Sequence, residues 1–169
     1  MTFGSGETEL ESFKVKRISD YDFDHVGLIL PKCDEKGEIL EYSYQLPTGV
    51  RPNKNARGPF CKLLPISTRK EAGVYVITVL DNPVYVGECE NLSRTFGPAG
   101  YGYISERNCY FDGQTTTCRI NSRFLQEYKK GNTINLWFFR SSDRISVKQN
   151  IIHKISPEWN GAKTEFLNG

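Results

Sequence analysis

Apolar positions in the first part of the chain fall into short runs that predict strands. Three runs lie at residues 13–18, 25–30 and 39–44. The last two are separated by residues 33–37, where Asp and Gly favour a turn. This spacing predicts a β-hairpin formed by the second and third runs. Residues 47–59 contain three prolines, which cannot donate a backbone hydrogen bond in a sheet, so we expect a loop there.

The middle of the chain shows a stronger strand pattern. Residues 73–80 form a run rich in β-branched side chains, and residues 84–87 form a second run after a three-residue turn. This arrangement predicts an antiparallel hairpin. Asn91 has the residue type and the place of a helix N-cap, and the Gly-Pro pair that follows Phe96 is expected to end a short helix.

Two further helices and one strand are expected in the last part of the chain. Apolar side chains recur at helical spacing in residues 119–130 and 147–155, and an apolar and aromatic strand lies between them at 134–140. A glycine follows the first helix and Pro157 follows the second, and both residue types end helices. Residues 97–117 lack such a pattern and are typical of a long binding or active-site loop.

The composition indicates one ordered domain rather than a disordered chain. The sequence has 169 residues, of which 38% are hydrophobic and 25% are charged. Its net charge of +2 is too small for the whole molecule to attract a polyanion, so nucleic-acid binding requires a local basic patch. Basic residues gather at 51–57 and 119–130, although an ordinary solvated surface is the simpler explanation of such runs.

Neither a membrane segment nor a disulfide framework is indicated. The chain has no apolar run of about 18 residues and no signal-peptide pattern, so we expect an intracellular, cytoplasmic protein. Its five cysteines are an odd number without a closely spaced pair, which favours reduced and buried thiols. A zinc site formed by Cys61, Cys89, Cys109 and Cys118 is the alternative.

Two tripeptides and the signals that follow them carry a family resemblance. The tripeptides are Gly73-Val74-Tyr75 and Tyr85-Val86-Gly87, one on each strand of the central hairpin. Asn91-Leu92 comes next, and Pro157-x-Trp159-Asn160 closes the last helix. In this order of elements, residues 72–161 resemble the GIY-YIG nuclease superfamily. Residues 100–105 and 118–121 resemble a branch of small proteins within it.

The resemblance implies a fold and a division of the chain. The implied fold is α+β, with a small, mainly antiparallel three-stranded sheet flanked by helices. We expect this GIY-YIG domain at residues 71–169. Residues 1–12 are then a mobile acidic start. Residues 13–70 form a β-rich extension that ends in the proline-rich loop.

The resemblance also implies hydrolysis of phosphodiester bonds with one Mg²⁺ ion. In the family, a glutamate of the last helix binds the metal, an arginine contacts the scissile phosphate, and tyrosines lie near the attacking water. The reaction requires a cation to absorb charge on the phosphate oxygens and a group to take a proton from water. Tyr75, Tyr85, Gly87 and Asn160 occupy the matching positions in this chain.

Two positions depart from the family pattern. Thr95 stands where the arginine is expected, and Arg94 lies one residue away, which is a rotation of about 100° on a helix. Lys148 stands at the position of the metal-binding glutamate. An ammonium group has no lone pair and repels Mg²⁺. We therefore interpret the catalytic site as inactivated and expect no metal cofactor.

Binding of nucleic acid can survive the loss of cleavage. Lys148 still attracts a phosphate as a point charge, and cations mixed with tyrosines suit a single or distorted strand. We expect nucleic acid, and above all DNA, as the partner. The residues assigned to it are Gly87, Tyr101, Arg107, Arg119 and Arg123. For the tyrosines of the Gly-rich loop, the simpler explanation is that they pack this loop against the domain.

Two other interpretations stay open. In one, the protein is an active Mg²⁺-dependent DNA endonuclease in which Glu88, Glu90 or Glu158 serves the metal and Arg94 serves the phosphate. In the other, it is a non-catalytic interaction module that works through its first 70 residues, with the nuclease-like part as a scaffold.

Overall fold

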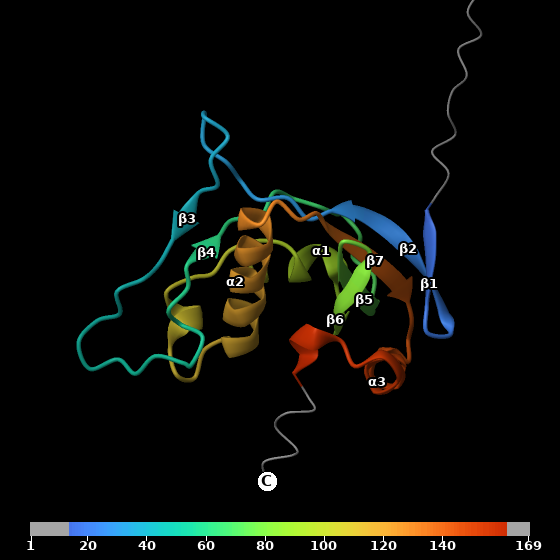
Figure 1. Cartoon of the computed structure of the whole chain (residues 1–169). Coiled ribbons are helices and arrows are strands. Elements are labelled where there is room, and N and C mark those ends of the chain that lie inside the picture. The colour runs from blue at the N-terminus through green and yellow to red at the C-terminus, as the bar shows by residue number, and fades with distance from the viewer. Residues whose placement is uncertain (1–13, 162–169) are drawn as a thin grey trace, which may run out of the picture.

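Five strands form one antiparallel sheet in the computed structural model, which describes residues 14–161 (Figure 1). They are β1 (Val15–Ile18), β2 (Tyr21–Leu28), β5 (Gly73–Val79), β6 (Asn82–Cys89) and β7 (Ile134–Arg140). Their order across the sheet is β1-β2-β7-β5-β6, and every neighbouring pair is antiparallel. The α+β class expected from the sequence is confirmed. The predicted acidic start at residues 1–12 lies outside the described residues.

The sheet is larger than the three strands expected from the sequence. Strands β1 and β2, which come from the segment before residue 71, extend it beyond β7. The reason lies in β7, where Leu136, Trp137 and Phe138 are all fully buried although successive side chains point to opposite faces. A strand that is apolar on both faces is stable in the interior of a sheet, where both of its edges are paired.

The helices form where the sequence predicts them, although the last two α-helices begin before the expected residues 119 and 147. They are α1 (Leu92–Thr95), α2 (Thr115–Lys129) and α3 (Arg144–Ile155), with single 3-10 turns η1 (Arg107–Cys109) and η2 (Glu158–Asn160). Asn91 caps α1, because its side chain accepts a hydrogen bond from the Arg94 N–H. Within residues 14–161, no helix has both the length and the apolar character needed to cross a membrane.

The two faces of the sheet pack against different helices. One face carries Tyr75, Ile77 and Phe138, and it contacts the apolar side of α2 through residues such as Phe124. The opposite face carries Val74, Val76, Val86 and Trp137, and it contacts Val147 and Ile151 of α3. Figure 1 shows α2 and α3 apart from each other, with η2 between them. The motif tyrosines and α3 therefore belong to separate cores.

The segment between β2 and β5 forms a lobe on the outer side of α2 (Figure 1). The predicted hairpin between residues 25–30 and 39–44 is wrong, because β2 pairs with β1 and β7 instead. The Asp-Gly turn itself is present and is closed by an isolated bridge between Cys33 and Ile39. Strand β3 (Glu41–Tyr42) pairs with β4 (Phe60–Cys61) across the loop at 47–59, which has no strand, as predicted.

A buried asparagine joins this lobe to the rest of the domain. Asn121 of α2 is fully buried, and its Oδ1 accepts from the Cys61 N–H at 2.9 Å. Its Nδ2 donates to the carbonyl oxygens of Cys61 and Tyr101, both at 2.8 Å. The amide thus completes the backbone hydrogen bonds of β4 and of the loop before α2.

Replacement of Asn121 by alanine should lower the free energy of unfolding by about 3–5 kcal/mol. The change leaves one N–H and two C=O groups buried without partners, and each costs about 1–3 kcal/mol less any relaxation. A urea titration of the purified protein measures this loss. Ser122→Ala is the control, since its exposed hydroxyl makes one hydrogen bond, to the Pro59 carbonyl, and its removal should cost less than about 1 kcal/mol. Equal losses in the two variants would contradict the role of Asn121.

Candidate functional site

The register of the central hairpin brings the two tripeptides face to face. Tyr75 lies opposite Gly87 in the ladder between β5 and β6. The Tyr75 ring fills the place where a Cβ of Gly87 would be, so any other residue at this position would collide with the ring. The Tyr85 ring, from the same face of β6, lies 6.2 Å from the Tyr75 ring between centroids. The glycine is therefore required because the tyrosine lies directly across the strand.

A third tyrosine from the Gly-rich loop completes this cluster. The hydroxyl groups of Tyr75 and Tyr101 form a hydrogen bond of 2.7 Å. Phe96 packs against both rings, at 5.0 Å and 5.2 Å between centroids. The Tyr101 backbone is held on both sides, because its N–H donates to Thr95 and its carbonyl accepts from Asn121. Tyr101 is buried, so its ring packs the loop into the domain and is not accessible to a base.

Burial controls the acid–base properties of these tyrosines. Removal from water raises the pKa of Tyr75 well above its ordinary value, and the neighbouring Tyr101 and Tyr85 raise it further. Burial likewise raises the pKa of Tyr101. Both hydroxyls therefore stay protonated at neutral pH. They can donate or accept hydrogen bonds, but neither is prepared to remove a proton from water.

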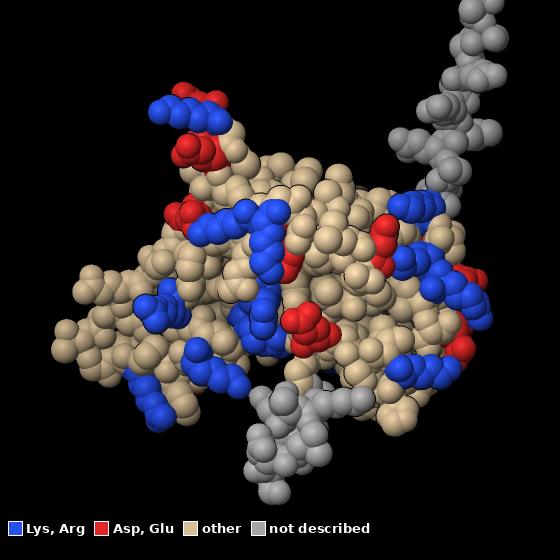
Figure 2. All heavy atoms as spheres, in the orientation of Figure 1, with Lys and Arg blue, Asp and Glu red and all other residues tan. Residues whose placement is uncertain are grey.

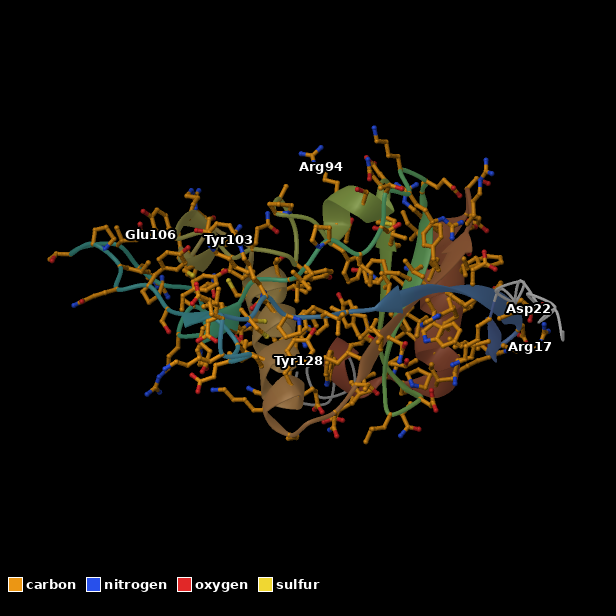
Figure 3. All side chains as sticks on the ribbon, turned by 90° about the horizontal axis from the view of Figure 1, so that it is seen from above. Arg17, Asp22, Arg94, Tyr103, Glu106 and Tyr128 are labelled. Atoms are coloured by element: carbon orange, nitrogen blue, oxygen red, sulfur yellow. The ribbon has the colours of Figure 1, made fainter. Side chains whose placement is uncertain are left out.

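An open cavity of about 280 Å³ lies beside the tyrosine cluster. Figure 3 shows the Arg94 side chain extending from α1 away from the body of the molecule. Arg94 is exposed and thus forms the rim of the cavity rather than its floor. The cavity is lined by Tyr75, Glu88, Arg94, Thr95, Ala99, Gly100, Tyr101 and Thr117.

Thr95 cannot act as the arginine that the sequence resemblance predicts at its position. Its hydroxyl donates to the Asn91 carbonyl at 3.0 Å, one turn back in α1. Its own carbonyl accepts from the Tyr101 N–H at 2.8 Å. The residue is therefore committed to holding α1 and the start of the Gly-rich loop together, and it brings no positive charge to the cavity.

The acidic residue of the cavity is already paired. The Arg144 Nε donates to Glu88 at 2.6 Å, and an Arg144 NH group donates to Glu90 at 3.3 Å. The guanidinium of Arg144, at the first residue of α3, thus bridges two of the carboxylates that could have served a displaced metal. Arg144 was not among the site residues predicted from the sequence, because its partners lie 54 and 56 residues away in the chain and no local pattern connects them.

Lys148 lies apart from the cavity that contains Tyr75. It follows Arg144 by one turn of α3, the helix that packs on the sheet face opposite the tyrosines. Its ammonium group forms no ion pair or hydrogen bond with any residue between 14 and 161, and the residue as a whole is half-buried. The arrangement does not suit a Mg²⁺ site, since Glu88 is bound to an arginine and the expected glutamate is a lysine.

Asn160 acts as a clamp on the outer edge of β6. Its Oδ1 accepts from the Val86 N–H and its Nδ2 donates to the Val86 carbonyl, each at 2.9 Å. Arg119 of α2 donates to the Trp159 carbonyl next to it. Asn160, predicted as a site residue, therefore anchors η2 to the strand that carries Tyr85 and Gly87.

The remaining basic residues assigned to nucleic acid do not line the cavity. Arg107 of η1 forms two hydrogen bonds of 2.8 and 2.9 Å with Asp112 and stacks on Tyr110. Arg119 is bound to Trp159, whereas Arg123 has no hydrogen bond or ion pair with a described residue. Figure 2 shows basic side chains in a vertical strip over α2, the helix that carries Arg119 and Arg123. This strip is a separate positive surface.

The cysteines are free thiols in the described part of the chain. Cys61, Cys89, Cys109 and Cys118 are all buried, and burial raises the pKa of Cys61 and Cys109 to about 12. Between residues 14 and 161, no group of three or more His, Cys, Asp or Glu side chains is placed to hold a metal ion. The thiols therefore act as apolar core groups in this structure.

Replacement of Asn160 by alanine should destabilise the protein by about 1–3 kcal/mol, because it removes both hydrogen bonds to Val86. Thermal or urea unfolding measures the loss. Asn150→Ala is a matched control on α3, since Asn150 is exposed and its side chain makes a hydrogen bond of 3.4 Å to Tyr21. A stable Asn160→Ala protein would show that the clamp contributes little.

Alkaline pH should weaken the fold through the buried tyrosines. Because the folded pKa values of Tyr75 and Tyr101 are raised, their contribution is complete below about pH 10 and is lost as the pH rises further, when the unfolded chain ionises first. The free energy of unfolding is measured in urea between neutral pH and pH 11, with tyrosinate absorbance recorded in parallel. In Tyr75→Phe the fall above pH 10 should be shallower. Full tyrosinate absorbance from the folded protein would contradict the burial of these hydroxyls.

Known families, curated proteins and solved structures were compared with this chain. No family model, no curated protein and no solved structure matches it. The cavity beside Tyr75, Tyr101 and Arg94 is the candidate functional site on the strength of its own geometry.

Proposed function

We propose that this protein is a GIY-YIG nuclease-like protein that binds nucleic acid, and DNA above all, through a catalytic site that no longer cuts. The observation that carries the proposal is the pairing of Glu88 with Arg144 beside the tyrosine cluster. Because of this pairing, the cavity contains the Arg94 cation and the buried tyrosine hydroxyls but no free carboxylate from residues 14–161.

The order of the elements supports the ancestry. Strands β5 and β6 form a hairpin that carries the two tripeptides, and α1, α2, β7 and α3 follow. Tyr75 lies on Gly87, which accounts for the presence of both residues in the paired tripeptides. Asn91 caps α1 and Asn160 clamps β6, so the two asparagines of the pattern each have a defined contact.

Three features argue against metal-dependent cleavage. Lys148 replaces the acidic ligand and cannot coordinate a cation. Thr95 replaces the arginine, and its hydroxyl is bound to the backbone. The pKa of Tyr75 is raised by burial, so its hydroxyl does not become a base near neutral pH. Each of these changes removes a different requirement of the reaction.

Binding is supported by the cations that have no carboxylate partner among residues 14–161. Arg94 projects from the rim of the cavity (Figure 3), whereas Lys148 on α3 and Arg123 on α2 are half-buried and lie outside it. Cations of this kind attract phosphate groups without the need for a metal. A polymer of phosphates can contact such dispersed charges together, whereas a small anion cannot.

The wild-type protein is expected to bind labelled duplex DNA with an affinity that falls as salt rises, and to leave a supercoiled plasmid uncut in Mg²⁺ or Mn²⁺. Lys148→Ala should weaken binding and reduce the slope of log K against log salt by about 0.9, the value for one phosphate contact. Fluorescence anisotropy and a nicking assay measure the two properties. Lys36→Ala, in the exposed turn before β3, is the charge-matched control. Identical binding by the Lys148 and Lys36 variants would remove α3 from the interface.

A second candidate is an active endonuclease with displaced groups. It is favoured by one observation, which is that Glu88 and Arg94 line the same cavity as Tyr75. Plasmid nicking by the wild-type protein that disappears in both Glu88→Gln and Tyr75→Phe would establish this candidate. It would also overturn the proposal of an inactivated site.

A further inference from the structure

A long segment of the chain before the central hairpin has no acidic residue. From Tyr42 to Lys70 there is no Asp or Glu, whereas six residues are Lys or Arg. The chain as a whole has a net charge of only +2, so this segment departs strongly from the average. In Figure 2, the lower left of the molecule shows basic side chains and no acidic ones on the face drawn, and Figure 1 places the loop of residues 47–59 there.

The loop at 47–59 is held in one shape by the loop around η1. Asn53 is buried, and its Nδ2 donates to the carbonyls of Asn108 and Tyr110 at 2.7 and 3.2 Å. Its backbone N–H donates to Cys109 at 2.9 Å. The Phe111 N–H donates to the Arg51 carbonyl at 2.8 Å. A ligand bound here need not order the loop first, which lowers the cost of binding.

This contact brings an arginine onto an exposed aromatic ring. The guanidinium carbon of Arg51 lies 4.1 Å from the centroid of the Phe111 ring. Phe111 is nevertheless 60% exposed, which is unusual for a phenylalanine. Next to it, Arg107 lies over Tyr110 at 5.0 Å. Stacked guanidinium and aromatic groups form the kind of surface on which unpaired bases stack.

A cavity lies on the same loop, and its lining includes Pro52, the residue after the arginine that stacks on Phe111. Its volume is about 360 Å³, which falls in the range of small-ligand sites. Apolar side chains supply one part of the wall and the cations Lys54 and Arg57 supply another. The lining residues are Tyr44, Leu46, Val50, Pro52, Asn53, Lys54, Ala56 and Arg57.

We infer that the loop at 47–59, together with Phe111, is a second nucleic-acid site, and that it takes a single strand. One base stacks on Phe111 beside Arg51, a neighbouring base enters the cavity, and the phosphates between them contact Lys54 and Arg57. A duplex is not accommodated in this way, because its bases are already stacked and paired. The inference rests on the proposed nucleic-acid function and adds the form of the ligand and a second place of contact.

Anisotropy of a fluorescein-labelled oligothymidylate with the full chain tests this site. Phe111→Ala should weaken binding at least fivefold, which corresponds to the loss of one stacked base, about 1 kcal/mol or more. Phe111→Trp should retain binding, whereas Phe111→Leu should not. Leu80→Ala is the matched control, since Leu80 is also 60% exposed but lies in the turn between β5 and β6. Arg57→Ala should reduce the salt slope by about 0.7, and Lys36→Ala should leave it unchanged.

The outcomes separate this inference from the proposed function. Equal binding by the Phe111→Ala and Leu80→Ala variants overturns the second site, while an effect of Lys148→Ala on duplex binding keeps the proposed function. The reverse result removes α3 from the duplex interface and supports the second site. Plasmid nicking by the wild-type protein that depends on Glu88 and Tyr75 overturns the inactivated site and leaves the second site standing. Polyglutamate and inorganic polyphosphate serve as competitors that carry charge but no bases. If either displaces the oligonucleotide as well as unlabelled oligothymidylate does at equal charge concentration, base stacking does not contribute to binding. Absence of any oligonucleotide binding by the wild-type protein overturns the second site as well.

Discussion

The Asn121 amide joins three segments that are distant in the sequence. From the middle of α2 it closes the hydrogen bonds of Cys61 in the outer lobe and of Tyr101 in the loop before the helix. Tyr101 in turn holds the hydroxyl of Tyr75 on the central strand. The placement of the candidate site therefore depends on a polar group in the core. Such a group has few alternative arrangements that satisfy it, which favours one packing of the lobe over others.

The sheet separates the residues of the family pattern into two environments. The tyrosines, Gly87 and Thr95 lie on the side of α2, whereas Lys148 belongs to the helix on the opposite face. The connection between these sides runs around the edge of β6 through Arg144 and Glu88. Arg144 already pairs with the carboxylate that lines the cavity. Both carboxylates at this edge are therefore paired within the protein itself.

Local patterns predicted most elements and the central hairpin of β5 and β6 correctly, but not the partners of β2. The helices and strands β5 to β7 follow from periodicity and from caps such as Asn91, because these signals act over a few residues. The pairing of β2 with β7 joins residues more than 100 positions apart, and no local signal encodes it. The turn of the central hairpin falls at Leu80 and Asp81, both with positive φ, where Asn or Gly would have marked it. Of the cavity, the sequence predicted individual residues such as Tyr75 and Arg94, but not the contact of Arg144 with Glu88.

The clamp formed by Asn160 also covers part of an open edge of the sheet. Strand β6 is the last in the sheet, so its outer backbone groups are open to pairing with another chain. Asn160 occupies the N–H and C=O of Val86 in the middle of that edge, as a residue of a further strand would do. A second sheet cannot align there without displacing it. An amide from the end of the same chain thus protects the strand of the second tripeptide against aggregation through its edge.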